Sequence, residues 1–467
     1  MAKTSIPVVT PQREDFPRWY QDVVAKAELA ESGPARGTMI IKPWGYAIWE
    51  RIQAELDARI KATGASNAYF PLFIPRTFLQ REAAHVEGFS PELAVVTHAG
   101  GEELAEPLIV RPTSETVIGD AMSRWVQGYR DLPLMLNQWS NVVRWELRPR
   151  LFLRTTEFLW QEGHTAHATA GEALDETLLI LTDVYEQVLR DVMALPVHVG
   201  RKTRAETFAG AEVTYTLEGL MRDEKALQLG TSHYMGTNFA EAFDIAFLDN
   251  NGRRRYAHTT SWGMSTRTVG GLIMTHGDDR GLRLPPMLAP AQAVVLAVRD
   301  EAIETCQRLA RDLAKADVRS IIDTDTTTGF GRRAVGWELK GVPVRIEIGP
   351  RDLHAGQAVV VRRDRDGKHP HPLDQLTTLV PRLLDEIQSD MYVLAERHRD
   401  NATVAIDDPA DVEGTGAFLI PWAALGVEGE AVLAERGFTV RCLLTPDLTP
   451  PAHGDDDGLV AWVARAY

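Results

Sequence analysis

The chain has 467 residues, 44% of them hydrophobic and 25% charged, so it is long enough for two to four domains with hydrophobic cores. Its formal net charge of −15, from 50 Lys and Arg against 65 Asp and Glu, argues against a protein that coats nucleic acid through a general positive field, although a local basic surface stays open. The two cysteines, Cys306 and Cys442, are too few for a disulfide framework or a cysteine-based zinc site.

The N-terminal stretch lacks a basic start followed by an apolar segment, and no run of about twenty apolar residues occurs anywhere in the chain. We therefore expect a cytoplasmic protein with no membrane association.

Residues 36 to 285 mix helical patterns with short stretches rich in aromatic and β-branched residues, and the two kinds do not alternate regularly. This favours an α+β fold built on an antiparallel sheet. One helix is expected to begin at Ser114, a good N-cap residue, and to run to the stop at Pro133, and a second should cover residues 171–195. Between them we expect two strands, at residues 141–146 and 154–165.

Arg144 and Glu146 alternate along the first of these strands, so they should project from one face into one cleft. A guanidinium and a carboxylate held in this way can bind a phosphate and a neighbouring amine or metal ion. An Arg-x-Glu pair on a strand is more often a surface salt bridge, so the pair alone does not establish a site.

Four side chains alternate along the second strand and can line one surface: Phe158, Trp160, Glu162 and His164. A carboxylate and an imidazole are costly to bury unless they have partners, which favours a functional surface. The alternative is a half-exposed antiparallel strand.

Three further segments carry polar groups that could join this surface. Residues 111–115 place a hydroxyl and a carboxylate at a helix start, although a simply capped helix has the same pattern. Residues 228–233 offer amide, hydroxyl and imidazole groups around Gly230. Residues 261–267 end in Arg267 at an expected helix start, where a cation can meet a phosphate.

A proline-rich segment at residues 282–292 suggests a domain boundary, after which strands and helices alternate as in a small α/β domain. The expected elements are strands at 294–299, 318–323, 343–348 and 357–363, a helix at 301–316 and a helix starting near Leu373. The last eighty residues suggest a third module that ends in a short strand within residues 458–467. We divide the chain into residues 1–285, 286–385 and 386–467.

Taken in this order, the segments resemble the motifs of class II aminoacyl-tRNA synthetases. The three class motifs would be residues 69–75 (YFPLFIP, with Pro71), Arg144 and Glu146 with Phe158, and residues 263–267. Within that class, the chain closely matches prolyl-tRNA synthetases of the archaeal and eukaryotic-like type in RPTSE, RWE, RTTEFLWQEGHTAH, LQLGTSH, TSWGMSTR and HGDDRGLRLPP. The resemblance runs over nearly the whole chain.

The resemblance implies a class II catalytic core on an antiparallel sheet, followed by an α/β anticodon-binding domain and a small α+β C-terminal domain. It implies an enzyme that activates L-proline with ATP and Mg²⁺ to prolyl-adenylate and transfers the prolyl group to the 3′ end of tRNA(Pro). A homodimer is implied by the first motif. The stretch between the second and third motifs is too short for the editing domain that some relatives insert there.

The family's site residues carry over by matching motif. ATP would be bound by Arg144, Glu146, Arg154, Thr155, Phe158, Gln228, Thr231 and Arg267. Of these, Arg144 and Arg267 would be catalytic, because they would stabilise the charge that moves to pyrophosphate. Proline would be bound by Thr113, Glu115, Arg144, Trp160, Glu162, His164, His233 and Ser261. The anticodon bases would be read by Glu338, Arg351 and Asp352, for which a solvated loop is the alternative.

The C-terminal module departs from the family pattern. Many relatives of this type carry four cysteines there for zinc, whereas Cys442 is the only cysteine of this module, so neither structural zinc nor any cysteine-bound metal is expected. The terminal tyrosine of the family can reach back to the catalytic domain, which suggests a structural role for Tyr467. A frayed terminus is the alternative.

Two other functions fit parts of the pattern. A class IIa synthetase for threonine or serine is disfavoured by the combination of Trp160, Glu162 and His164. A non-catalytic paralogue is disfavoured because Arg144, Phe158 and Arg267 are all present.

Overall fold

The computed structural model of the chain describes residues 8–78, 93–454 and 457–467, and a single large sheet of eleven strands runs through these residues. In spatial order its strands are β20 (Thr403–Ala405), β21 (Ala417–Pro421), β23 (Val460–Ala464), β22 (Thr439–Leu444), β9 (Val197–Arg201), β10 (Val213–Leu220), β11 (Ala226–Gly236), β14 (His258–Ser265), β8 (Glu157–His167), β7 (Leu134–Val143) and β3 (Ser66–Asn67). Neighbouring strands are antiparallel except at the two ends of the sheet, where β20–β21 and β3–β7 are parallel. The predicted antiparallel α+β core is confirmed.

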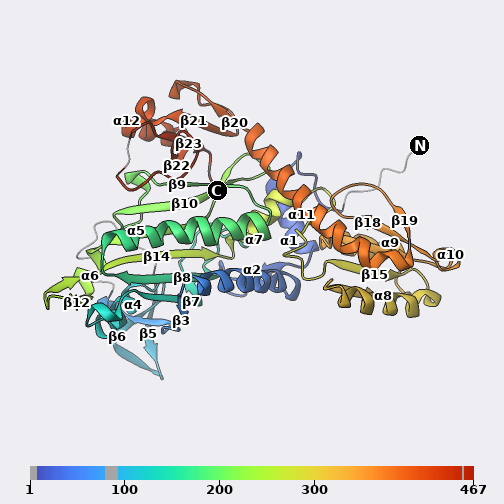
Figure 1. Cartoon of the computed structure of the whole chain (residues 1–467), viewed down its shortest axis with the longest axis horizontal. Helices are drawn as coiled ribbons and strands as arrows, with labels where there is room; N and C mark the ends of the chain where they lie inside the picture. The colour runs from blue at the N-terminus through green and yellow to red at the C-terminus, as the bar shows by residue number, and fades with distance from the viewer. Residues whose placement is uncertain (1–7, 79–92, 455–456) are drawn as a thin grey trace.

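Helices cover one face of this sheet, as Figure 1 shows for the long helical stretch that begins with α5. The helices of this layer and its surroundings are α1 (Phe16–Lys26), α2 (Pro43–Ala62), α5 (Ala170–Leu179) with its π-helical continuations η2 (Ile180–Tyr185) and η3 (Val188–Val192), and α7 (Arg267–His276). Thr169 caps α5 in a reciprocal box with Glu172, and the apolar side of the stretch is buried against the sheet. The predicted helix at residues 171–195 is confirmed apart from its final turn.

Strand alternation decides which side chains face the helices. On β14, Trp262 packs against Tyr185 of the helical stretch, while on β8 Gln161 accepts a hydrogen bond from the Tyr185 hydroxyl at 2.6 Å. The neighbouring residues on each strand must therefore point to the opposite face. That opposite face carries the polar side chains singled out in the sequence.

A smaller sheet follows the proline-rich segment, in the order β16 (Ser320–Asp323), β15 (Ala293–Ala297), β17 (Val344–Ile348), β18 (Gln357–Arg362) and β19 (His369–Pro372). Strand β15 is parallel to both β16 and β17, whereas β18 and β19 run antiparallel. The helices of this module are α8 (Ile303–Lys315), α9 (Phe330–Leu339) and α10 (Pro350–His354). The four predicted strands and the helix at 301–316 are confirmed, whereas α9, α10 and β19 were not predicted.

The long helix α11 (Leu376–Asn401) leads from the α/β module to the C-terminal module, as the diagonal orange helix in Figure 1 shows. The boundary drawn between residues 385 and 386 falls inside this helix. The C-terminal module also contains α12 (Trp422–Glu435), which bends at Gly426, and the predicted final strand is present as β23. Leu443 of β22 pairs with Arg201 of β9, so the module extends the large sheet.

Most of the remaining elements lie around the large sheet. They are the three-stranded sheet β4 (Phe73–Pro75), β6 (Glu102–Val110) and β5 (Ala94–Ala99), the hairpins β1 (Ala30–Ser32) with β2 (Met39–Ile41) and β12 (Ala246–Leu248) with β13 (Arg254–Tyr256), the helices α4 (Glu115–Trp125) and α6 (Asn238–Phe243), and the 3₁₀ turns at Tyr129–Asp131 and Arg204–Glu206. Three further 3₁₀ turns belong to the two later modules, at Asp300–Ala302, Leu373–Gln375 and Pro409–Asp411. Within the described ranges, no helix is both long and apolar enough to cross a membrane.

The prediction that the helix after Ser114 continues to Pro133 is wrong. Helix α4 ends at Trp125, because Val126 adopts an extended conformation and a 3₁₀ turn follows. The carboxylate of Asp131 accepts hydrogen bonds from the backbone N–H groups of Gln127 and Gly128, which favours this turn over further helix. Pro133 therefore precedes strand β7 instead of ending a helix.

The prediction that Arg144 and Glu146 share a strand face is also wrong. Strand β7 ends at Val143, opposite the first residue of β8, Glu157. One more hydrogen bond, from the Arg144 N–H to the Thr156 carbonyl at 2.8 Å, extends the pairing. The Thr156 N–H then donates to the carbonyl of Gly37, so the β7–β8 ladder ends there. Arg144 and Glu146 thus lie in the loop that follows the strand. The expectation that they project into one cleft is nevertheless met, because both line the same hollow.

Candidate active site

A cavity of about 240 Å³ opens on the polar face of the large sheet, above β8, β10, β11 and β14. Twelve of the side chains singled out in the sequence line it: Thr113, Glu115, Arg144, Phe158, Trp160, Glu162, His164, Gln228, Thr231, His233, Ser261 and Arg267. They come from segments far apart in the chain, and the antiparallel order β11-β14-β8 places them together.

Glu162 is the centre of a buried hydrogen-bond network at one end of the cavity. Its Oε1 accepts from Ser114 Oγ at 2.5 Å and from Gln138 Nε2 at 2.9 Å, while its Oε2 accepts from the Ser114 backbone N–H at 3.1 Å. Nε2 of His164 lies 3.2 Å from the same Oε2. A buried carboxylate with this many donors is held in one orientation.

Ser114 therefore does not act as the side-chain cap that the sequence suggested. The Ser114 hydroxyl makes no cap hydrogen bond to α4, because it is turned toward the buried network: it donates to Glu162, and its oxygen accepts from Gln138 Nε2 at 3.2 Å. A charge-assisted hydrogen bond to a buried carboxylate is stronger than a neutral cap hydrogen bond, and this favours the orientation of the Ser114 hydroxyl toward Glu162.

A second carboxylate lies at the same end of the cavity. Glu115 is buried at the start of α4 and accepts a short hydrogen bond from Thr113 Oγ1. Its charge reaches both His164 and Arg144. Two carboxylates, one hydroxyl and one imidazole thus form an acidic end suited to a small cationic group.

Arg144 stands between the acidic end and the aromatic wall of the cavity. Its Nε donates to the Pro112 carbonyl at 2.9 Å, and its guanidinium lies 5.6 Å from the ring centre of Phe158 and 5.4 Å from that of Trp160. Solvent reaches the side chain through the open cavity although protein surrounds it. This partial desolvation lowers the pKa of Arg144, and the charges of Glu115 and Glu162 oppose the shift.

Arg267, the first residue of α7, supplies a second cation. Its Nε donates to the Leu153 carbonyl at 3.1 Å, and its backbone N–H donates to Ser265 Oγ at 3.2 Å. Burial lowers the pKa of Arg267 to about 10, and the charges of Arg144 and Arg154 act in the same direction. Cations that repel one another in this way favour an anion between them.

A second hollow, of about 400 Å³, adjoins the first cavity and shares Arg144, Phe158, Ser265 and Arg267 with it. The three remaining residues predicted for ATP line only this hollow: Glu146, Arg154 and Thr155. Arg154 Nε lies 3.4 Å from Glu146 Oε2, an exposed pair of small energetic weight. The predicted ATP residues are therefore divided between two connected hollows.

His233 and Ser261 complete the wall opposite Arg144. Nδ1 of His233 lies 2.9 Å from Thr214 Oγ1, and its ring tilts against Phe208 with centroids 4.6 Å apart. Burial, together with the charges of His164 and Arg144, lowers the pKa of His233 to about 3, so the imidazole is neutral at pH 7. The His233 ring can therefore donate or accept hydrogen bonds only as an uncharged group.

Sequence reasoning missed four lining residues, namely Lys202, Glu206, Phe208 and Thr214. It also missed Ser114 and Gln138 as partners of Glu162. Thr214 belongs to the strand VTYTLEGL, whose polar residues alternate, and this period could have identified it. Lys202, Glu206 and Phe208 lie in an irregular loop with no local signal.

The three predicted anticodon residues lie in the α/β module, at the ends of α9 and α10. Glu338 pairs with Arg280 of the preceding domain, with Oε1 and Nη1 3.2 Å apart. Asp352 accepts a hydrogen bond from the Gly349 backbone N–H at 2.9 Å and thereby caps α10. Arg351 is exposed.

Neither cysteine is available as a ligand. Cys306 and Cys442 are buried, and burial raises the pKa of both thiols. In the part of the chain that the structure describes, no group of three or more His, Cys, Asp or Glu side chains could hold a metal ion.

Tyr467 docks on the catalytic domain, outside the candidate cavity. Its backbone N–H donates to the Ala226 carbonyl, its hydroxyl donates to Asp223 at 2.6 Å, and its ring lies 5.2 Å from the Lys225 ammonium. The terminus is therefore not frayed.

Comparison with known proteins gives two family matches. Residues 97–276 match the tRNA synthetase class II core domain (G, H, P, S and T), and residues 292–383 match an anticodon binding domain. A proline–tRNA ligase of Frankia alni is 58% identical over 466 residues, which cover 98% of this chain and 100% of the relative. A proline–tRNA ligase 2 of Streptomyces avermitilis is 56% identical over 476 residues, which cover 100% of both chains.

Among solved structures, the chain is similar to prolyl-tRNA synthetase from Cryptosporidium parvum in complex with halofuginone and AMPPNP. The two share 36% sequence identity with a TM-score of 0.92, over 99% of each chain.

Proposed function

The chain belongs to the proline–tRNA ligases, a family of class II aminoacyl-tRNA synthetases, and from this premise we propose how its cavity works. The enzyme activates L-proline with ATP to prolyl-adenylate and pyrophosphate, and then transfers the prolyl group to the 3′ end of tRNA(Pro). One observation carries the assignment of the site: Arg144 joins an acidic end to a cationic, aromatic end within one cavity.

The acidic end is the proposed proline site. The secondary ammonium of proline would meet Glu115 and Thr113, whose hydroxyl and carboxylate already contact each other. Trp160, Glu162, His164, His233 and Ser261 would enclose the ring. Because a pocket of this kind distinguishes one or two methylenes by only about 1–3 kcal/mol, alanine is the expected misactivated substrate.

The cationic end is the proposed ATP site. Phe158 would stack on adenine, Gln228 and Thr231 would face the ribose, and Arg267 would bind the γ-phosphate. The second hollow, with Glu146, Arg154 and Thr155, adjoins this region and supports a bent nucleotide that occupies both hollows.

Arg144 would bind both the α-phosphate and the proline carboxylate. A carboxylate oxygen attacks the α-phosphorus, the bond to the β-phosphate oxygen breaks, and pyrophosphate leaves with the electron pair. Arg144 and Arg267 stabilise the charge that develops, and no protein nucleophile is needed. Mg²⁺ bound to the ATP phosphates would supply further charge neutralisation. Glu146 is a suitable single carboxylate for an ion whose other ligands are phosphates and water.

The α/β module is proposed to read the anticodon through Arg351, with Glu338 and Asp352 as weaker candidates. The Arg351 side chain is exposed and positively charged, whereas the carboxylates of Glu338 and Asp352 already have protein partners. We retain the three-part division of the chain as a proposal, with the second and third parts joined through α11. Structural zinc is not part of the proposal.

A homodimer formed through the first motif is supported by large apolar side chains exposed on and around β4, β5 and α4. They are Tyr69, Phe73, Val95, Trp125 and Tyr129. Exposed apolar side chains gathered in one region are typical of subunit interfaces. We also propose that the enzyme acts in the cytoplasm, where its substrates are found.

ATP–pyrophosphate exchange, measured with proline, threonine, serine and alanine in turn, tests the function. Exchange should depend on proline, be weak with alanine and be absent with threonine and serine. Charging of tRNA(Pro) then tests the second step. Exchange driven by threonine or serine, or no exchange with any amino acid, would overturn the proposal.

A further inference from the structure

A fully buried carboxylate, Glu218 of β10, lies beside the candidate active site without lining it. Its position on β10 is directly opposite Gln228 on β11, and Thr216 is opposite Thr231. Residues opposite each other in an antiparallel pair point to the same face of the sheet. Glu218 is therefore a cross-strand neighbour of the residues proposed to meet the ATP ribose.

Two cations share this carboxylate. Lys202 Nζ donates to Glu218 Oε1 at 3.0 Å, and the guanidinium of Arg441 donates to both oxygens at 3.0–3.1 Å. The Thr216 hydroxyl also donates to Oε1 at 3.0 Å. The side chains of Lys202 and Glu218 are 3% and 0% exposed, so water screens their interaction weakly.

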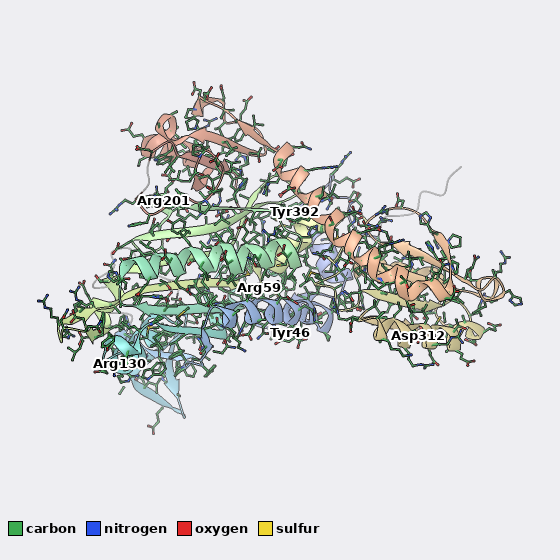
Figure 2. All side chains as sticks on the ribbon, viewed as in Figure 1. Tyr46, Arg59, Arg130, Arg201, Asp312 and Tyr392 are labelled. Atoms are coloured by element: carbon green, nitrogen blue, oxygen red, sulfur yellow. The ribbon has the colours of Figure 1, made fainter. Side chains whose placement is uncertain are left out.

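Arg441 comes from the C-terminal module, 223 residues further along the chain than Glu218. It reaches the carboxylate because β22 lies against β9, and Gly200 of β9 permits this close approach. A Cβ atom at Gly200 would lie 2.7 Å from Cys442 Cβ and 2.7 Å from the Leu443 carbonyl oxygen. Figure 2 labels Arg201, the last residue of β9, at this junction with the C-terminal module.

Lys202 lies where two hollows meet. It lines the candidate active-site cavity, and it also lines a groove of about 1040 Å³ between the catalytic domain and the C-terminal module. The same groove is lined by Arg201, Arg204 and His453. The Lys202 side chain therefore borders both hollows, although it is almost fully buried.

Within the trio itself, two cations, Lys202 and Arg441, share the single anion Glu218. Two further carboxylates lie near them: the charge of Glu206 acts on Arg441, and the charge of Lys202 acts on Glu430. The trio is adjacent to the proposed ATP site. Of the two cations only Lys202 lines the cavity, and its ammonium has three N–H groups, one of which donates to Glu218. The others can donate to a ligand.

We propose that Arg441 and Glu218 are positioning residues that hold Lys202 in the cavity wall, where its ammonium binds a phosphate group of a substrate. Arg441 shares the carboxylate, so Glu218 does not neutralise Lys202 completely. The phosphate belongs either to ATP in the first step or to the 3′-terminal nucleotide of tRNA in the second. The inference rests on the proposed function, and it assigns part of the active site to the C-terminal module.

The test uses the full-length protein with Lys202→Met and Arg441→Met, singly and together. Proline-dependent ATP–pyrophosphate exchange gives KM for ATP and kcat, and single-turnover transfer from preformed prolyl-adenylate gives the apparent affinity for tRNA. We expect Lys202→Met to weaken one of these two affinities about tenfold or more, the size of one charge-assisted hydrogen bond. A change in KM for ATP identifies the nucleotide as the source of the phosphate, and a change in tRNA affinity identifies the tRNA.

Arg441→Met should weaken the same affinity although Arg441 does not line the cavity. The double variant should be no weaker than Lys202→Met, because both substitutions remove one interaction. Arg441→Lys should restore most of the affinity. Arg465→Met is the matched control. Arg465 belongs to the same module, but its guanidinium donates to the backbone carbonyls of Gly414 and Arg436 and lies over the Phe438 ring, away from Glu218 and Lys202. This variant should leave both affinities at the wild-type value.

Additive effects in the double variant, or wild-type affinities in both single variants, would overturn the inference. Should Arg441→Met fail to fold, Lys202→Met still tests whether Lys202 binds the phosphate, because this variant leaves Glu218 paired with Arg441. A wild-type enzyme without proline-dependent exchange rejects the proposed function itself. An active wild type with an unaltered Lys202→Met variant rejects only the inference.

Discussion

Nε2 of His164 lies 3.2 Å from Oε2 of Glu162, and both side chains are buried on the same face of β8. Burial lowers the pKa of His164, but its hydrogen bond with Glu162 and the charges of Glu115 and Glu162 outweigh burial and raise it. Burial raises the pKa of Glu162, but His164, Ser114 and Gln138 outweigh it and lower it. Both shifts favour the charged forms, so the two residues attract each other as an ion pair when His164 is protonated.

The affinity for proline should depend on this pair. The stabilising contribution of this pair is fully present below the ordinary His pKa of about 6.5 and is lost as pH rises through the raised pKa of His164. At acidic pH the contribution is lost only below the ordinary Glu pKa of about 4.3, where Glu162 becomes protonated. KM for proline should therefore stay constant near pH 6 and rise at higher pH. His164→Asn should raise KM at pH 6 and abolish the dependence. An unchanged pH profile in that variant would contradict the assignment.

Arg144→Ala should abolish activation while leaving the fold intact. Removal of a cation that stabilises transition-state charge costs about 100- to 1000-fold in rate, and here the substrate carboxylate also loses its partner. Proline-dependent exchange measures the loss, and circular dichroism checks the fold. Arg148→Ala, an exposed arginine on the same loop outside both hollows, should retain full exchange. Robust exchange by Arg144→Ala would remove that residue from the mechanism.

Gly163→Ala should damage the proline site from the opposite face of β8. A Cβ atom at Gly163 would lie 2.1–2.2 Å from the Trp262 ring, so either the ring or the strand that carries Glu162 and His164 must move. Overpacking of this kind costs about 1–3 kcal/mol, measured by urea unfolding, and KM for proline should rise with it. Gly171→Ala is the control, because a Cβ there meets nothing within 4 Å. Equal stabilities for the two variants would argue against the clash.

Asp278→Asn should weaken the contact between the catalytic domain and the α/β module. Arg363 of that module donates to both Asp278 oxygens at 2.6 and 3.0 Å, and Arg283 lies 2.7 Å away. Burial raises the pKa of Asp278, but these arginines outweigh it and lower the pKa from 3.8 to about 2. This shift corresponds to about 2 kcal/mol of stability at neutral pH.

The stability difference between wild type and Asp278→Asn should be present at pH 7 and should diminish between about pH 4 and 2, because a depressed folded-state pKa loses its contribution there. Denaturant unfolding at several pH values measures it. Lys315→Gln, which removes the exposed pair of Lys315 with Asp312, should cost less than about 0.5 kcal/mol. A pH-independent difference for Asp278→Asn would exclude ionisation as its cause.

Removal of metal ions should leave the folded protein unchanged. Cys442 is buried within the C-terminal module, where it packs against β9, and burial raises the pKa of its thiol. A chelator should therefore not lower the Tm, while omission of Mg²⁺ should stop the ATP-dependent reaction. A fall in Tm after dialysis against chelator would reveal a structural metal.

Several features of the site followed from sequence pattern because they depend on local geometry. The two-residue period of a strand is enough to place Phe158, Trp160, Glu162 and His164 on one surface. The start of α7 at Arg267 follows from the change of pattern after Ser265. The position of Arg144 and Glu146 in a loop was not predicted. Strand β7 ends where its pairing with β8 ends, and the pairing of two strands cannot be seen in the residues of one of them.

The sequence by itself determined the family, the antiparallel α+β core and most of the residues that line the cavity, because motifs and strand periods are properties of neighbouring residues. Tertiary structure alone decided how each polar group is used. It directs the Ser114 hydroxyl to Glu162 instead of a helix cap, it pairs Glu338 with Arg280, and it brings Arg441 to Glu218. These choices depend on which buried charge lies within hydrogen-bond distance, and in a low-dielectric interior such a charge outweighs local preference.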